Sequence, residues 1–234
     1  MPELWLGFLK ALKLLATLDR EVMEIAGRSL AISSLACLVA MVVCLPLAGV
    51  IHFNRFPARR LLISAIQTLY GIPTVLVGLL VFLLFSRSGP MGFLGLLFTP
   101  ALMVIGQALL IMPVILGLTI SALAGLDRKV SRTAVSLGAS RFQAALLTLR
   151  EARFMVLSAL IMGFGRAISE VGLALMAGGN IRGYTRTLTT AISLETAKGD
   201  IELALALGMI LLLIALIINI ALNRLQQAGS DESH

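Results

Sequence analysis

Hydrophobic residues lie along this chain in long unbroken runs rather than in an alternating pattern. Charged side chains are absent from four stretches, namely Ser29–Asn54, Leu61–Ser86, Ser88–Leu126 and Leu203–Asn223. A helix needs about 20 residues to cross roughly 30 Å of hydrocarbon, so each stretch can hold a membrane span. Lipid offers the backbone no hydrogen-bond partners, and such runs must therefore be helical. The pattern predicts an all-α polytopic membrane protein.

We expect about five transmembrane helices in one domain over residues 29–222, followed by a short polar tail over residues 223–234. The predicted spans cover residues 29–51, 61–85, 99–121, 155–179 and 202–222. The uncharged run that begins at Ser88 is too long for one span and too short for two. Glycines and a proline near its start interrupt this run, and we expect the interrupted part to form a short external or re-entrant helix. Pro46, Pro73 and Pro113 fall one in each of the first three spans, where proline can kink a helix.

Residues 1–28 form a separate N-terminal amphipathic segment in this interpretation. Trp5 and several leucines are interleaved with Lys10 and Lys13, a pattern typical of a helix that lies at the membrane interface. The same lysines interrupt the apolar run that a cleavable signal peptide needs. The alternative is that residues 4–18 cross the membrane.

Composition agrees with the hydrophobic pattern, since 59% of the residues are hydrophobic, 13% are charged and the mean hydropathy is +0.99. In a chain this apolar, we interpret the net charge of +7 as basic residues that set the orientation in the membrane, not as a nucleic-acid binding surface. The loops on one side of the membrane carry ten Lys or Arg: three in residues 52–60, six in residues 122–154, and Arg224. The loops on the opposite side carry eight. The positive-inside rule then predicts an external N-terminus and a cytoplasmic C-terminus.

Motifs of the common enzyme classes are absent from the sequence. There is no GxxxxGK[ST] phosphate loop, HExxH, paired CxxC or GxSxG. The two histidines, His52 and His234, lie far apart in the sequence. We therefore expect no enzyme activity, no metal and no cofactor in this chain, and the energy for any active transport would come from another polypeptide. A passive channel or an ion-driven carrier is the alternative class.

A long basic loop, residues 122–154, separates the third and fourth spans. Its centre resembles the cytoplasmic EAA loop of binding-protein-dependent ABC importer permeases. Arg132, Thr133 and Ala134 occupy the opening positions, Gly138 is the family glycine, and LGAS ending at Ser140 matches a frequent variant. The chain departs from the family pattern at the opener, which is acidic in the family and basic here.

Four other stretches extend the resemblance. They are GIPTVLVGLL (71–80), GFGRAISEVG (163–172), GGNI (178–181) and TRTLTTAI (185–192). These are similar to permeases of oxyanion importers, most of all to those that take up tungstate, with molybdate or another oxyanion as the alternative cargo. The resemblance implies a homodimer in the cell inner membrane, two cytoplasmic ATPase subunits and an extracytoplasmic anion-binding protein.

The resemblance also implies that the loop forms short coupling helices that insert into a groove on each ATPase. The positions implied in this contact are Arg132, Ala134, Val135, Leu137, Gly138, Ala139, Ser140, Arg141 and Phe142. The glycine would permit a tight turn, and the apolar members would supply buried contact. The alternative is a solvated basic loop that only fixes topology.

Two opposite charges fall inside the fourth predicted span. Arg166 and Glu170 are four residues apart, which places them on one face of a continuous helix. Ionisable groups in a span are costly and face the bundle interior or a wet cavity. An internal salt bridge is the favoured interpretation, because Glu170 beside the route would repel an anion. The alternative is that Arg166 faces the route and attracts the cargo.

A polar stretch joins the fourth and fifth spans. We expect external contacts to the anion or to the binding protein from Asn180, Arg182, Arg186, Thr189 and Thr190. Hydroxyls and amides give weak, easily released hydrogen bonds to an anion, and arginines can steer it. The alternative is an ordinary external loop with a helix cap.

Overall fold

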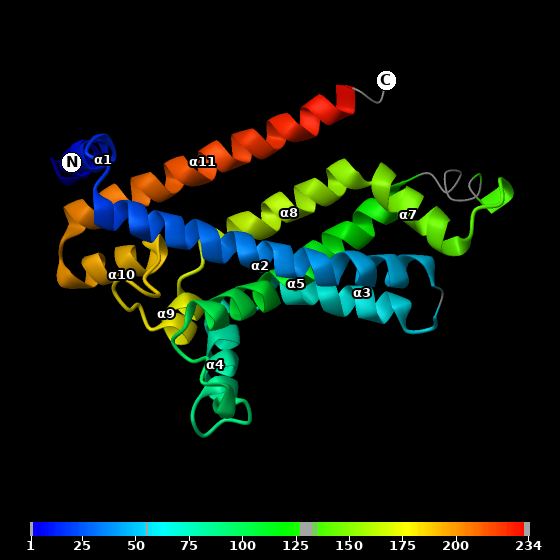
Figure 1. Cartoon of the computed structure of the whole chain (residues 1–234), viewed down its shortest axis with the longest axis horizontal. Coiled ribbons are helices and arrows are strands. Elements are labelled where there is room, and N and C mark those ends of the chain that lie inside the picture. Colours follow the sequence, from blue (N-terminus) through cyan, green and yellow to red (C-terminus); the bar gives the residue numbers. More distant parts are fainter. Residues whose placement is uncertain (1, 55, 127–132, 134, 232–234) are drawn as a thin grey trace.

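The computed structural model describes residues 2–54, 56–126, 133 and 135–231, and every regular element in these ranges is helical. Four helices run along the long axis of the molecule: α2 (Arg20–Phe53), α5 (Pro100–Gly125), α8 (Arg153–Ile168) and α11 (Ile201–Asp231) (Figure 1). The N-terminus lies near the start of α11, and the C-terminus lies toward the opposite end (Figure 1). The all-α membrane fold expected from the sequence is confirmed.

Shorter elements connect or flank these helices. They are α1 (Pro2–Ala16), α3 (Arg59–Thr68), α4 (Thr74–Phe85), α7 (Arg141–Glu151), α9 (Gly172–Gly178), α10 (Leu188–Lys198) and the 3-10 turns η1 (Leu69–Gly71) and η2 (Gly92–Leu94). Side-chain caps explain where several helices begin. The Asp19 carboxylate accepts a hydrogen bond from the Val22 amide at 3.0 Å at the start of α2. Thr99 does the same for α5, with Pro100 in the first helical position.

Three helices are long and apolar enough to cross a bilayer unbroken, namely α2, α5 and the Ile201–Arg224 part of α11. The second and fourth predicted spans are each a bent pair of helices. The first pair, Arg59–Gly71 with Thr74–Phe85, bends by 98°, and the second, Arg153–Ile168 with Gly172–Gly178, bends by 64°. Counting each bent pair as one span gives five spans, the number expected from the sequence. The expectation that the second and fourth spans are continuous helices is wrong, because each is bent at a break.

A stripe of small side chains on α2 forms the centre of the bundle. Ala36, Ala40, Cys44 and Ala48 recur every fourth residue and are each at most 1% exposed. Residues at this spacing share one helix face, and small side chains let a neighbouring helix approach closely. The neighbour is α5, whose Ile111 is fully buried in the same cluster. Both helices run without interruption through Pro46 and Pro113, so these prolines do not break them.

Element boundaries differ from the predicted ones at both ends of the chain. Residues 1–28 do not form one segment, because α1 ends at Ala16 and α2 begins at Arg20. Helix α1 packs against α11, with Lys10 Nζ 3.4 Å from an Asp200 carboxylate oxygen, and Figure 1 shows it nearly end-on. Helix α11 continues past residue 222, and the short helix expected before α5 is the three-residue 3-10 helix η2.

Close contact between α4 and α9 generates a testable prediction. A Cβ added at Gly78 would lie 2.9 Å from the Leu173 Cα, a backbone atom that cannot move aside. We expect Gly78→Ala to lower the free energy of unfolding by about 1–3 kcal/mol, because the two helices must separate. Thermal unfolding of the purified chain in detergent measures the loss. Gly27→Ala is the matched control, since nothing lies within 4 Å of its added Cβ; equal melting temperatures for both variants would contradict the packing.

Candidate functional site at two broken spans

The bends of the second and fourth spans lie against each other. Helices α4 and α9, which follow the two bends, are in extensive contact. The added Cβ of Gly172, the first residue of α9, would lie 2.9 Å from a Val75 methyl group in the first turn of α4. Pro73 precedes α4 and cannot donate a backbone hydrogen bond, which accounts for the first break. The site is therefore built where two interrupted spans meet.

Side chains satisfy the backbone groups that the break between α8 and α9 leaves free. Glu170 is 5% exposed, and its carboxylate accepts a hydrogen bond from the Leu173 amide at 2.8 Å, so it caps α9. The Thr189 hydroxyl donates to the Glu170 carbonyl at 2.7 Å. Glu170 is thus held at the break by α9 on one side and by α10 on the other.

Arg166 lies in the last turn of α8 and reaches toward the other break. Its Nη2 donates to the Ile72 carbonyl at 3.4 Å, immediately before Pro73. The expected salt bridge to Glu170 is not formed, because α8 ends at Ile168 and the two side chains no longer share a helix face. Among the residues that the structure describes, Arg166 has no carboxylate within 4.0 Å, and its Nε is buried without a hydrogen-bond partner.

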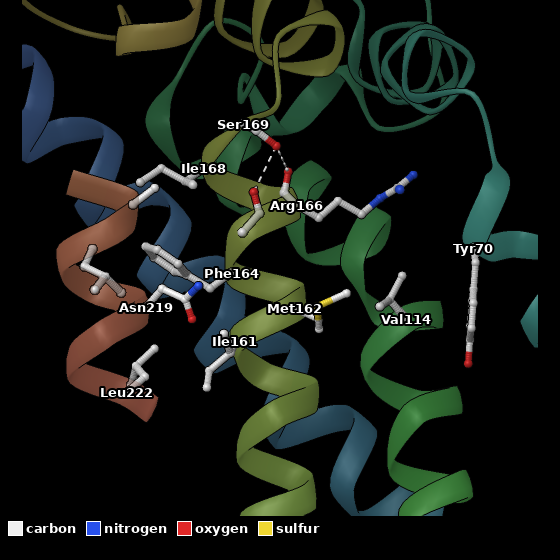
Figure 2. A pocket seen from close by; sticks show the side chains of 13 residues that line it. Tyr70, Val114, Ile161, Met162, Phe164, Arg166, Ile168, Ser169, Asn219 and Leu222 are labelled. Atoms are coloured by element: carbon white, nitrogen blue, oxygen red, sulfur yellow. Dashed lines mark hydrogen bonds between the residues drawn. The ribbon is translucent and has the colours of Figure 1, made fainter. Parts of the chain in front are cut away.

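A cleft of about 560 Å³ lies beside Arg166 (Figure 2). It is bounded by α8, α11, α5 and η1, and most of its wall is apolar. The polar side chains on the wall are Tyr70, Arg166, Ser169 and Asn219. Ser169 is exposed at the end of α8, where its hydroxyl contacts the carbonyls of Gly165 at 2.9 Å and Arg166 at 3.2 Å. Arg166 is thus the cationic group on the wall of a largely hydrophobic cleft.

The threonines at the N-cap and in the first turn of α10 lie in the interior. Thr189 is 6% exposed and Thr190 is fully buried. Thr187 and Thr190 form the capping box that begins α10, and the Asn180 amide donates to the Thr190 carbonyl at 3.3 Å. Their hydrogen bonds are made within the protein, as in a capped loop. Anion contact by Asn180, Thr189 and Thr190 stays a prediction.

The two arginines of this loop are held by a glutamate at the start of α2. Arg182 donates to both carboxylate oxygens of Glu21, with its Nε at 2.8 Å, and an Arg186 nitrogen lies 3.9 Å from Glu21. The hydrogen bond to Glu21 raises the pKa of Arg182 above its already high range. Arg186 also donates to the Asn180 side chain at 3.2 Å. Arg182 remains exposed, as a contact with an external partner requires. External contacts by Arg182 and Arg186 stay predictions.

Comparison with known proteins assigns the chain to a family. The profile of the family described as "Binding-protein-dependent transport system inner membrane component" matches residues 44–228. The chain belongs to this family. It is accordingly a multi-pass membrane component of a transport system.

Several curated members of this permease family are similar over most of their length. The chain is 39% identical over 221 residues to the tungstate uptake system permease protein TupB of Peptoclostridium acidaminophilum, covering 94% of this chain and 97% of that one. It is 35% identical to TupB of Campylobacter jejuni, covering 94% and 92%. It is 41% identical to a probable anion ABC transporter permease of Haloferax volcanii, covering 85% and 88%.

Solved structures show the same permease fold at lower identity. A bacterial ABC transporter that imports the acidic polysaccharide alginate matches with a TM-score of 0.70 at 19% identity, covering 88% of this chain and 79% of that one. The alginate transporter in complex with its pentasaccharide-bound periplasmic protein matches with a TM-score of 0.74 at 20% identity, covering 97% and 87%. These likenesses establish the fold.

The described part of the segment that resembles the permease EAA loop, residues 135–142, lies beside α7 at the end of the molecule opposite the N-terminus (Figure 1). Gly138 has a φ of 90°, a left-handed conformation that glycine adopts without strain. Ser140 and Gln143 form a capping box that begins α7. Leu137 is 83% exposed and Val135 is 50% exposed. Arg132 and Ala134 lie outside the described residues, and the coupling role of the whole set stays a prediction.

Sequence reasoning overlooked several members of the site. Four of these groups lie around Arg166 or its cleft, namely the Ile72 carbonyl, Tyr70, Ser169 and Asn219. None of them forms a pair of opposite charges, which is the pattern that singled out Arg166 and Glu170 in the sequence. Glu21 was overlooked because it precedes the first apolar run. Only the Gly-Ile-Pro sequence at residues 71–73 signals the break beside Arg166, since glycine and proline together favour a turn.

The capping role of Glu170 can be tested directly. Glu170→Ala removes the acceptor of the Leu173 amide, and we expect a loss of roughly 1 kcal/mol in the free energy of unfolding. Glu170→Gln keeps an acceptor oxygen and should lose less. Thermal unfolding in detergent compares the two with Glu24→Ala, which removes an exposed ion pair with Arg20. If Glu170→Ala unfolds at the temperature of the unaltered chain, the cap contributes nothing.

Proposed function

We propose that this chain is the membrane-spanning subunit of an ATP-driven ABC importer whose cargo is an oxyanion, with tungstate as the substrate. The similarity to TupB proteins over 94% of the chain carries this proposal. It is supported by the position of Arg166 on the cleft wall, because a positive charge in a span suits a route for anions. The chain would move the anion by alternating access and catalyse no chemistry itself.

The proposed assembly is a homodimer with two cytoplasmic ATPase subunits and an extracytoplasmic anion-binding protein. A separate ATPase is supported by the absence of a phosphate loop from the sequence. An external delivery protein is supported by the fold, which is shared with a transporter solved together with its periplasmic protein. The exposed Leu137 in the segment before α7 suits a contact with the ATPase.

The proposed orientation places α7 and the C-terminal end of α11 on the cytoplasmic side. The N-terminus and the loop from α9 to α10 would then lie outside. The two ends of the molecule in Figure 1 are compatible with this arrangement, because α7 lies far from the N-terminus. The basic residues of positions 52–60 and 122–154 support it through the positive-inside rule.

Another oxyanion is the second candidate cargo. Sulfate transport permeases of Escherichia coli and Synechocystis are 26% and 27% identical over 80% and 73% of this chain. Molybdate and tungstate are tetrahedral dianions of closely similar size, so we expect the delivering protein to make most of the distinction. A channel or an ion-driven carrier would need no ATPase, and the experiment below separates these classes.

Uptake into proteoliposomes tests the proposed function. The vesicles contain the chain with its ATPase, the binding protein is added outside, and ATP is enclosed within. We expect tungstate to accumulate only when ATP and the binding protein are both present, and to do so faster than molybdate or sulfate. Accumulation without ATP would contradict the importer, and faster molybdate uptake would transfer the cargo assignment to that anion.

The exposed turn before α7 supplies a second test. Leu137→Glu places a charge in the proposed ATPase contact, and we expect co-purification with the ATPase to fall by about tenfold or more, because an apolar anchor is lost. Phe93→Glu is the control, since Phe93 is 85% exposed on the η2 turn, outside the proposed contact. Both variants should keep the melting temperature of the unaltered chain. An ATPase yield that is the same for both variants would remove Leu137 from the interface.

A further inference from the structure

The charge of Arg166 lies deep within the fourth span. Arg166 is thirteen residues after Arg153, the first residue of α8, which places it about 20 Å along the helix at 1.5 Å per residue. The hydrocarbon layer is roughly 30 Å thick, so with Arg153 at its cytoplasmic boundary the Cα of Arg166 lies well inside it. An arginine at this depth needs a counter-charge, a set of hydrogen-bond acceptors or water.

The protein supplies little of that requirement. Among the described residues the guanidinium makes a single hydrogen bond, a long one of 3.4 Å to the Ile72 carbonyl, and its buried Nε has no partner there. Glu170, the nearest acidic residue in sequence, is turned into α9 and occupied by the Leu173 amide. No salt bridge to Arg166 occurs within the described part of the chain.

The cleft provides space for the missing counter-charge. Its volume of about 560 Å³ exceeds that of a small tetrahedral anion many times over, and it is open enough for water to enter with the anion. Apart from Tyr70, Arg166, Ser169 and Asn219 the wall is apolar, so a bound anion would meet one strong attraction rather than many (Figure 2). A single strong contact favours release, which a transport route requires.

We propose that the transported oxyanion is the counter-ion of Arg166 and binds transiently in this cleft as it crosses the membrane. This inference rests on the proposed function and adds a residue and a place to it. The ligand class is a small tetrahedral dianion. Glu170 takes no part in binding and keeps α9 in position.

Ser169 allows the cleft to be probed without measuring transport. It is exposed on the cleft wall, three residues from Arg166. In the Ser169→Cys chain, assembled with its ATPase in nanodiscs, we measure labelling by a sulfonate-bearing and by a trimethylammonium-bearing methanethiosulfonate. The sulfonate reagent should react at least about fivefold faster relative to its rate with a free thiol, because the nearby positive charge attracts it. Millimolar tungstate should slow the reaction.

Three further variants in the Ser169→Cys background isolate the charge. Arg166→Gln should abolish both the preference for the sulfonate reagent and the protection by tungstate. Arg166→Lys keeps the charge and should retain the preference. Arg60→Gln, at an exposed position, is the control and should behave like the parent. The chain without the new cysteine gives the background from Cys37 and Cys44.

Uptake measurements complete the test. In an otherwise unaltered chain, Arg166→Gln should lower tungstate uptake by about tenfold or more, and Arg166→Lys by less. Equal labelling by the two reagents, no protection by tungstate, or full uptake by Arg166→Gln would each overturn the inference. Labelling reports the anion site and uptake reports transport. If the unaltered chain fails to transport but labelling is charge-selective and blocked by tungstate, the proposed function falls while the site stands.

Discussion

Peptide groups inside hydrocarbon have no water to bond with, so every backbone donor and acceptor there needs a partner within the protein. The structure depends on this constraint at two places, because two of the five spans are interrupted and their backbone groups lose helical partners. At the break between α8 and α9, the Glu170 side chain accepts from the Leu173 amide and the Thr189 hydroxyl donates to the Glu170 carbonyl. At the other break, the Ile72 carbonyl receives Arg166. The polar side chains that the sequence suggests as anion-binding groups therefore serve first as hydrogen-bond partners of the backbone. The guanidinium of Arg166, which is left without a counter-charge among the described residues, defines the site.

The uninterrupted helices supply the frame that keeps these breaks in place. The small-residue stripe of α2, with Ala36 and Ala40 fully buried, lets α5 lie close along its length. The contacts between α4 and α9 are tighter still, since Gly78 faces the Leu173 backbone and Gly106 of α5 faces the Leu173 side chain. Leu173 thus joins both bent spans to the frame. A movement of α9 must be accompanied by movement of α4.

The spans could be predicted because long apolar runs leave the backbone no alternative to helix. The break before α4 is signalled by Gly-Ile-Pro at residues 71–73, but the break between α8 and α9 could not be predicted. GFGRAISEVG contains no proline, and a continuous helix would place Arg166 and Glu170 four residues apart on one face. The helix stops at Ile168 because tertiary partners stabilise the interruption, and these come from α10 and α4, distant in sequence. Likewise, burial of Thr190 depends on how the loop folds back. Before α7, Val135 and Leu137 are exposed in the single chain. The proposed contact of these positions would be with a second protein, which the sequence of this chain cannot describe.

Local hydrogen bonds and burial against the bundle shape the segment from Gly138 to Glu151. A left-handed glycine turns the chain, Ser140 and Gln143 fix the start of α7, and Ala144 and Thr148 are buried. At the other end Ala152 joins α7 to α8 directly, without a loop. A protein that docked here, as proposed, would meet a surface that is already ordered and would lose little conformational entropy in binding it. Force applied by such a protein at the exposed turn would reach α8 through α7, because only Ala152 separates α7 from the helix that carries Arg166.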